Sequence, residues 1–190
     1  MSTQTRLMTA EEFGARPDRD DGCREELVAG VIQVAPPVQE SHGDIEWNLA
    51  EILRPFVRQH RLGKVRGAAG YQVAADPDHV PGPDASFLSN ERAAQFPKTG
   101  TYRNVAPDLA IEIVSPSNRA DEMHAKVQGY LAGGSRRVWV LYPETRSLTV
   151  HREDGNAHTF TGDDVVTSDD AGFAAAGFEA PVSAFFEDID

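Results

Sequence analysis

The sequence predicts an α/β fold in which helices pack on a mixed β-sheet. A strand–helix–strand pattern from residue 108 to residue 142 implies a parallel strand pair joined by a right-handed crossover. Apolar residues recur at helical spacing over residues 41–60, which predicts a long amphipathic helix. The length of 190 residues is enough for one domain with one substantial core.

The first forty residues predict a short helix followed by a β-hairpin. Thr9, with Glu12 three residues later, forms a capping-box pattern within MTAEEF. Residues 16–23 are polar and turn-like. Residues 24–37 alternate apolar and polar side chains around Gly30 and end at two prolines, so we expect a small antiparallel hairpin there.

The next segments predict the long helix and two strands. Pro55 lies inside the helical pattern of residues 41–60 and is expected to kink or shorten the helix. Residues 64–74 predict a strand weakened by two glycines, and residues 84–88 predict a short strand after a Pro-Gly-Pro turn. Residues 90–106 are expected to form a mobile connection.

The strongest strand prediction is PDLAIEIVS, residues 107–115. Asn118 is a candidate N-cap for the helix that follows, with Asp121 at the N3 position, and Gly133 with Gly134 ends that helix. One face of the helix is apolar, and it consists of Ala120, Met123, Val127, Tyr130 and Leu131.

The C-terminal part predicts further antiparallel strands. Residues 136–143 read as a buried strand, which pairs as a hairpin with residues 147–153. The remainder predicts short antiparallel additions and a final turn near PVSAFFED. We therefore expect a single domain over residues 1–190, with a core of about 40–145 and acidic C-terminal additions at 146–190.

Composition and charge narrow the classes of function. Apolar residues make up 40% and charged residues 25%, and no run of about 18 apolar residues predicts a membrane span. The N-terminal segment lacks the apolar region of a secretory signal, so a cytoplasmic protein is expected. Cys23 is the only cysteine, which excludes an internal disulfide and a multi-cysteine zinc site.

The net charge of −12 is concentrated at the C-terminus. Residues 151–190 hold ten acids and one base, a net charge of −9, whereas residues 1–150 carry only −3. An acidic surface repels nucleic acid at long range, which counts against a high-affinity nonspecific DNA binder. The acidic net charge does not exclude a local basic groove that binds nucleic acid.

Glu112 is the first candidate for chemistry. It lies in the middle of an apolar strand, where an unpaired carboxylate is expensive to bury. Strand alternation places Glu112 on one face with Ala110 and Val114. The competing interpretation is a structural ion pair or a solvent-facing position on an edge strand.

Asp84 and Lys126 are weaker candidates when each is taken alone. Asp84 follows Pro83 and could be an ordinary turn aspartate. Lys126 lies at the margin of the apolar helix face and could extend its ammonium to solvent. Two acids on neighbouring strands and a lysine nonetheless suit hydrolysis of a phosphodiester with Mg²⁺.

Several blocks of the sequence resemble the Uma-two family of restriction endonuclease-like proteins, within the PD-(D/E)xK superfamily. The resemblance covers roughly residues 8–186 and is most specific in the middle of the chain. The matching blocks are MTAEEF, Arg24 to Gly30, Ser41-His42, Pro83-Asp84, Ala106 to Ser117, the spacing of Lys126 and Tyr130, and Trp139 with Pro143.

This resemblance implies a restriction endonuclease-like core and a role for five of the matched residues. Asp84 and Glu112 would bind Mg²⁺ or Mn²⁺, and Lys126 would be the active-site lysine, because Val114 occupies the usual lysine position. Glu26 would be a further catalytic acid near the metal. His42 would lie next to the metal-binding residues, although it could equally face solvent at the start of its helix.

Residues outside the matched motifs depart from the family or suggest other contacts. Glu25, Ala29, Gly82, Glu122, Arg137 and Tyr142 differ from the family pattern, which affects the surroundings of the site but not Asp84, Glu112 and Lys126. A basic run includes Arg58, Arg61 and Lys64, which could contact phosphates or form a solvated helix face. No phosphate-binding loop or Gly-x-Ser-x-Gly motif occurs.

Two classes of function remain from these observations. The first is a metal-dependent endonuclease that acts on nucleic acid, most simply DNA. The second is a catalytically inactive protein that keeps the nuclease fold for binding or regulation. The exposed-looking hairpins and the family resemblance also suggest an interaction protein that forms a homodimer. A homodimer is compatible with either class, because duplex cleavage often uses paired subunits, and no membrane partner is expected.

Overall fold

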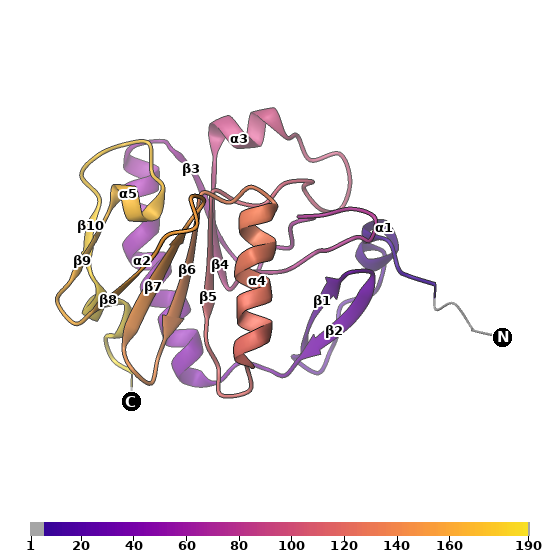
Figure 1. Cartoon of the computed structure of the whole chain (residues 1–190), viewed down its shortest axis with the longest axis horizontal. Coiled ribbons are helices and arrows are strands. Elements are labelled where there is room, and N and C mark those ends of the chain that lie inside the picture. Colours follow the sequence, from indigo (N-terminus) through magenta and orange to yellow (C-terminus); the bar gives the residue numbers. More distant parts are fainter. Residues whose placement is uncertain (1–5, 190) are drawn as a thin grey trace.

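A six-stranded mixed sheet forms the centre of the molecule (Figure 1). The computed structural model describes residues 6–189. Residues 1–5, part of the N-terminal segment in which no secretory signal is expected, lie outside the described residues. The strands, in spatial order, are β3 (Gly63–Gly67), β4 (Ala85–Ser89), β5 (Leu109–Ile113), β6 (Arg137–Tyr142), β7 (Ser147–Arg152) and β8 (Ala157–Thr161). Only β5 and β6 are parallel among these neighbours, which confirms the mixed α/β sheet.

Two helices cover opposite faces of this sheet (Figure 1). Helix α2 (Glu40–Gln59) packs with Leu109, Ile111 and Ile113 of β5, and α4 (Ala120–Ala132) packs on Ala110 of the other face. The alternation expected along β5 is therefore confirmed, and it places Glu112 on the face that carries α4.

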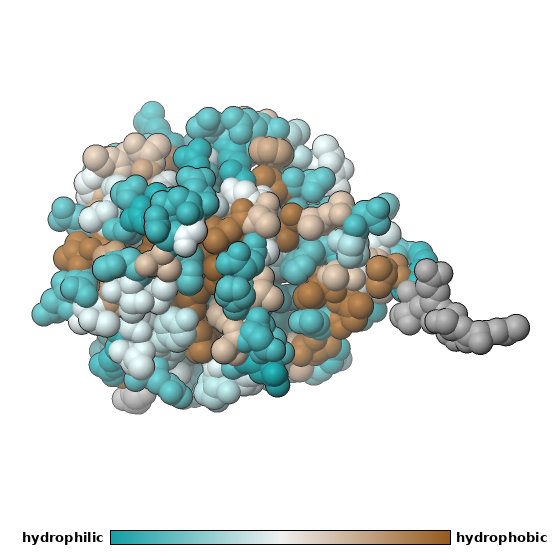
Figure 2. All heavy atoms as spheres, in the orientation of Figure 1, coloured by the Kyte–Doolittle hydropathy of each residue, from teal (hydrophilic) through white to brown (hydrophobic). Residues whose placement is uncertain are grey.

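Smaller antiparallel elements flank the sheet. After the capped helix α1 (Ala10–Gly14), β1 (Arg24–Val28) and β2 (Val31–Ala35) form the expected N-terminal hairpin. Figure 2 shows apolar side chains gathered over this hairpin, which includes the exposed Val31 and Val34.

The C-terminal segment adds a small two-stranded sheet and packs into the main core. Strand β9 (Val165–Thr167) pairs with β10 (Glu179–Pro181), and α5 (Ser168–Ala171) and the 3₁₀ helix η1 (Val182–Phe186) complete the segment. Four of its aromatic side chains join the core cluster beneath α2, namely Phe173, Phe178, Phe185 and Phe186. Strands β7 and β8 extend the main sheet beyond residue 145.

Four local details differ from the predictions. Pro55 does not shorten α2, because it lies on the exposed face while Leu53 and Val57 stay buried. The strand expected over residues 64–74 ends at Gly67, because Ala68 adopts a positive φ of 35°. The connection over residues 90–106 begins with a helix, and Asn118 is not an N-cap.

The reasons for the last two differences are local hydrogen bonds. The Ser89 hydroxyl accepts the Arg92 N–H and caps α3 (Asn90–Gln95). The Asn118 carboxamide accepts the Ser115 N–H at 2.8 Å, so α4 begins later, with Arg119 at the N-cap. No described helix is both long enough and apolar enough to cross a bilayer.

Candidate active site

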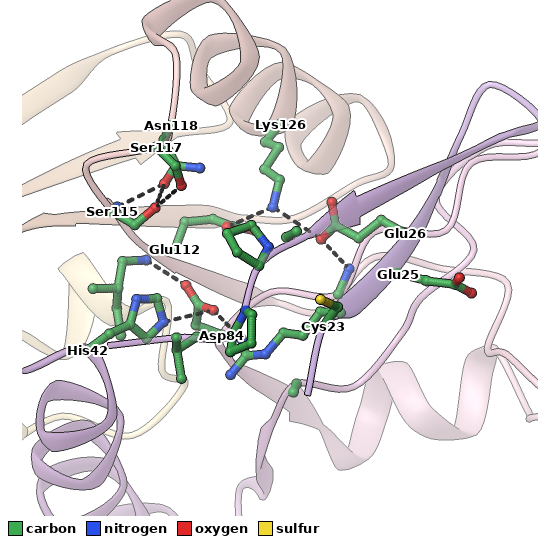
Figure 3. Close-up of a pocket in the computed structure, with 18 of the residues that line it drawn as sticks. Cys23, Glu25, Glu26, His42, Asp84, Glu112, Ser115, Ser117, Asn118 and Lys126 are labelled. Atoms are coloured by element: carbon green, nitrogen blue, oxygen red, sulfur yellow. Dashed lines mark hydrogen bonds and ion pairs between the residues drawn. The ribbon is translucent and has the colours of Figure 1, made fainter. Parts of the chain in front are cut away.

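A cavity of about 1440 Å³ opens between the β1–β2 hairpin and the ends of the central strands. Five of the predicted site residues line it, and they reach it from separate elements: Glu26 from β1, His42 from α2, Asp84 before β4, Glu112 from β5 and Lys126 from α4. Figure 3 shows Lys126 and His42 directed toward the carboxylates, whereas Glu25 points away.

Asp84 and Glu112 meet because β4 and β5 are antiparallel neighbours. The register pairs Ala85 with Ile111, so Asp84 and Glu112 lie one residue beyond this pair on their two strands. Both side chains are almost fully buried, with residue exposures of 6% and 3%. The sheet register therefore brings together two acids that are 28 positions apart in the sequence.

Glu112 is held by two hydrogen-bond donors from α4. The Tyr130 hydroxyl donates to Oε1 at 2.7 Å, and the Lys126 ammonium donates to Oε2 at 3.0 Å. Burial raises the pKa of Glu112 to about 7, and the Lys126 charge limits that rise. Tyr130 and Lys126 are four residues apart, so both lie on the same side of α4.

Lys126 bridges Glu112 to a second carboxylate. Its Nζ also donates to Glu26 Oε1 at 3.1 Å, and the same oxygen accepts the Gly82 N–H at 3.0 Å. Burial alone would lower the pKa of Lys126, but the carboxylates of Glu112 and Glu26 outweigh burial and raise it. Lys126 is therefore a cation at neutral pH.

Both carboxylate oxygens of Asp84 also accept hydrogen bonds. Its Oδ2 accepts the Ile113 N–H at 2.8 Å, and its Oδ1 accepts from the Arg24 guanidinium at 2.7 Å. Burial would raise the pKa of Asp84, but the adjacent His42 and these hydrogen bonds lower it. Arg24 also donates to Glu46 at 2.8 Å, so one guanidinium bridges two acids.

His42, Glu46 and Asp84 form a cluster with the spacing of metal ligands. One ligand atom from each residue lies within 4.8 Å of the other two. His42 Nε2 lies 3.1 Å from Asp84 and 3.3 Å from Glu46, yet neither ring nitrogen makes an aligned hydrogen bond within the described chain. Burial would lower the pKa of His42, but the two carboxylates outweigh it and raise the pKa to about 9.

Sequence reasoning anticipated part of this arrangement and missed the rest. It assigned no role to Arg24, Glu46 or Tyr130. Glu46 is four residues after His42, so helical spacing could have placed the two on one face. Arg24 is two residues before Glu26, so strand alternation could have placed both side chains over the cavity.

The basic residues proposed as phosphate contacts lie elsewhere in the same chain. Arg58 is in the last turn of α2, Arg61 follows that helix, and Lys64 is on β3. None of the three lines the cavity that holds Asp84. Within one chain, the structure therefore does not bring them to the candidate site.

Comparison with known proteins gives two findings. The model of the Uma2 family, described as "Putative restriction endonuclease", matches residues 10–180. The fold is similar to the crystal structure of a "putative nuclease belonging to DUF820" from Anabaena variabilis, with a TM-score of 0.77 and 21% sequence identity. That likeness covers 94% of this chain and 97% of the other, which confirms the expected α/β fold with a mixed sheet flanked by helices. No curated protein matches the chain.

Proposed function

Because this chain belongs to the Uma2 family, described as "Putative restriction endonuclease", we propose that it is a metal-dependent endonuclease. The reaction that we assign is hydrolysis of phosphodiester bonds in nucleic acid, with DNA as the substrate. The observation that carries the proposal is the convergence of Asp84, Glu112 and Lys126 on one large cavity.

We propose that Asp84 and Glu112 bind Mg²⁺ or Mn²⁺. Carboxylate oxygens are preferred ligands of both ions. The fit is supported by the close spacing of His42, Glu46 and Asp84 and by His42 Nδ1, which has no hydrogen-bond partner among the described residues. An imidazole nitrogen suits transition metals better than Mg²⁺, so we expect Mn²⁺ to bind more tightly. A bound ion would polarise the scissile phosphate and offset the charge that develops on it.

Lys126 would act as a hydrogen-bond donor and a fixed positive charge. Two carboxylates raise the pKa of Lys126 and keep it protonated, which suits a donor rather than a general base. Its ammonium can orient the attacking water or stabilise negative charge on the phosphate. Glu26 and Glu112 hold it in place, and Glu26 supplies a further acid at the same cavity.

A nuclease assay tests the proposal directly. The purified chain should cut supercoiled plasmid, linear duplex or single-stranded DNA with Mg²⁺ or Mn²⁺, and EDTA should abolish cutting. RNA substrates included in parallel identify the preferred nucleic acid. An Asp84→Asn protein purified in the same way controls for contaminating nucleases, and equal activity of the two proteins on every substrate would overturn the assignment.

A second candidate function is supported by one observation. The clustered acids already have internal cations, because Arg24 and His42 contact Asp84 while Lys126 contacts Glu112. A site whose acids are neutralised in this way could belong to a protein that keeps the nuclease fold for binding or regulation and does not cleave nucleic acid. Calorimetry with Mn²⁺ separates the two functions, since the inactive binding protein would show no metal binding.

Arg24 should oppose metal binding while it stabilises the metal-free protein. Its guanidinium contacts Asp84 and Glu46, so a metal ion at Asp84 must compete with it. We expect Arg24→Met to destabilise the metal-free fold by about 2 kcal/mol, because it leaves the buried Asp84 and the partly buried Glu46 less well paired. We expect the same change to tighten Mn²⁺ binding about tenfold, or about 1.4 kcal/mol.

Thermal unfolding without metal and calorimetry with Mn²⁺ measure these two opposite effects. Arg119→Met is the matched control, because Arg119 is exposed and, among residues 6–189, forms an ion pair only with the exposed Asp121. Weaker Mn²⁺ binding by the Arg24→Met protein would show that Arg24 supports the metal site rather than competing with the ion.

A further inference from the structure

The outer face of α2 carries a regular stripe of exposed side chains. Its members are separated by alternating steps of four and three residues, so they follow one line along the helix. All are exposed, and they are Glu40, Asp44, Trp47, Glu51, Arg54 and Arg58. The stripe lies opposite the buried residues of α2, on the side that faces away from the sheet.

Trp47 is the least expected member of this stripe. It is 69% exposed, more than any other exposed large apolar side chain in the described residues. It borders a groove of about 350 Å³, which is also lined by Arg54, Pro55 and Arg58. A large aromatic side chain beside a groove is typical of a protein-binding surface.

The charges of the stripe are separated along the helix. Glu40 and Asp44 lie toward its N-terminus, whereas Arg54 and Arg58 lie toward its C-terminus. None of the four forms an ion pair in the part of the chain that the structure describes. The helix dipole favours this order of charges, but it does not account for an exposed tryptophan between them.

We propose that two copies of this chain associate through α2, with the two helices antiparallel about a two-fold axis. In one register, Glu40 lies opposite the partner's Arg58 and Asp44 lies opposite the partner's Arg54. The same register places Trp47 beside the partner's Glu51. A stripe with acids at one end and bases at the other is complementary to itself only in this antiparallel arrangement.

The groove and a glycine fit this arrangement. Helical side chains lean toward the N-terminus, so Trp47 is directed toward the position of the partner's Arg54, where it can stack on the guanidinium. Gly43 is an unfavourable residue inside a helix, and a Cβ there would have no neighbour within 4 Å. The absence of a side chain at Gly43 leaves room for the approaching helix.

Pairing through α2 would also change the surroundings of the candidate site. His42 and Glu46 lie in the N-terminal half of α2, and Gln39 and Ser41 line the cavity. The antiparallel register brings the partner's Arg58 to this end of the helix. A basic residue that is remote from the cavity in its own chain would then pair with Glu40, next to the cavity-lining Gln39 and Ser41 of the other copy.

Charge exchange between two variants tests this interface without relying on nuclease activity. Arg54→Glu with Arg58→Glu makes both ends of the stripe acidic, and Glu40→Lys with Asp44→Lys makes both ends basic. We expect the wild type to sediment at twice the chain mass of 20.7 kDa at about 100 µM. Each variant alone should show a dissociation constant raised about a hundredfold, and an equimolar mixture of the two should recover the dimer.

Circular dichroism verifies that each variant is folded, and Lys98→Glu with Arg119→Glu is a control with the same change in charge away from the stripe. High salt should weaken the wild-type dimer, because the paired charges are exposed. A wild type that stays at the monomer mass would overturn the proposal. A dimer that persists in both charge variants would also overturn it, since the interface would then lie elsewhere.

Discussion

The Asp84→Asn protein is expected to bind Mn²⁺ at least about a hundredfold more weakly than the wild type and to lose nuclease activity. Asparagine keeps the shape of the side chain but removes its charge. Asp84 belongs both to the proposed pair with Glu112 and to the cluster with His42 and Glu46. No other residue is shared by the two sets, so this substitution should have the largest effect on metal binding.

The same substitution should have a measurable structural cost. The amide oxygen can still accept the Ile113 N–H, but the amide nitrogen would face Arg24 and His42, which are both donors. We expect a loss of about 1–3 kcal/mol in the free energy of unfolding of the metal-free protein. Urea unfolding at neutral pH measures this loss, and circular dichroism shows whether the fold is retained.

Asp121→Asn is the matched control for this experiment. Asp121 is an exposed acid in the first turn of α4, outside the cavity. It should leave Mn²⁺ affinity and cleavage within about twofold of the wild type. If Asp84→Asn and Asp121→Asn give the same calorimetric curves with Mn²⁺, Asp84 is not a metal ligand.

How far the site could be predicted depends on the kind of contact involved. The burial of Glu112 follows from strand alternation, and the approach of Lys126 follows from the short connection between β5 and α4. Both are local patterns. The contact between Arg24 and Asp84 joins residues 60 positions apart, and it depends on where the N-terminal hairpin lies on the finished sheet. Nothing in the periodicity of either segment fixes that placement.

The fold was predicted best where a hydrophobic repeat continues over many residues. Helix α2 has enough apolar repeats to be recognised even with Pro55 inside it. The free energy gained by burying its apolar face exceeds the cost of the one backbone hydrogen bond that Pro55 removes. The end of β3 was missed because it depends on the backbone conformation of Ala68. Helix α3 was missed because six residues without a buried side chain carry no periodic signal.

Lys126→Met should cause the largest loss of stability among single substitutions at the site. It removes the cation between Glu112 and Glu26 and leaves Glu112 buried without a charged partner. Breaking a buried pair in this way costs about 3–5 kcal/mol. Cleavage should fall at least about a hundredfold, because the donor proposed for the attacking water or the phosphate is lost.

The stability loss should depend on pH in a defined direction. Burial already raises the pKa of Glu112 to about 7, and loss of the Lys126 charge should raise it further. A carboxyl group whose folded pKa exceeds its unfolded value favours the folded state only while it is protonated, so stability falls as pH rises through this range. The Lys126→Met protein should therefore lose more stability relative to the wild type at pH 8 than at pH 5.

A double-mutant cycle with Glu112→Gln separates the ion pair from simple packing. Once Glu112 is neutral, Lys126→Met no longer strands a buried charge at that position, so the double variant should be more stable than the sum of the single losses predicts. We expect a coupling energy of at least about 2 kcal/mol from urea unfolding at pH 8. Additive losses would mean that Lys126 contributes through its methylene chain, in which case Lys126→Arg and Lys126→Met should differ little in stability.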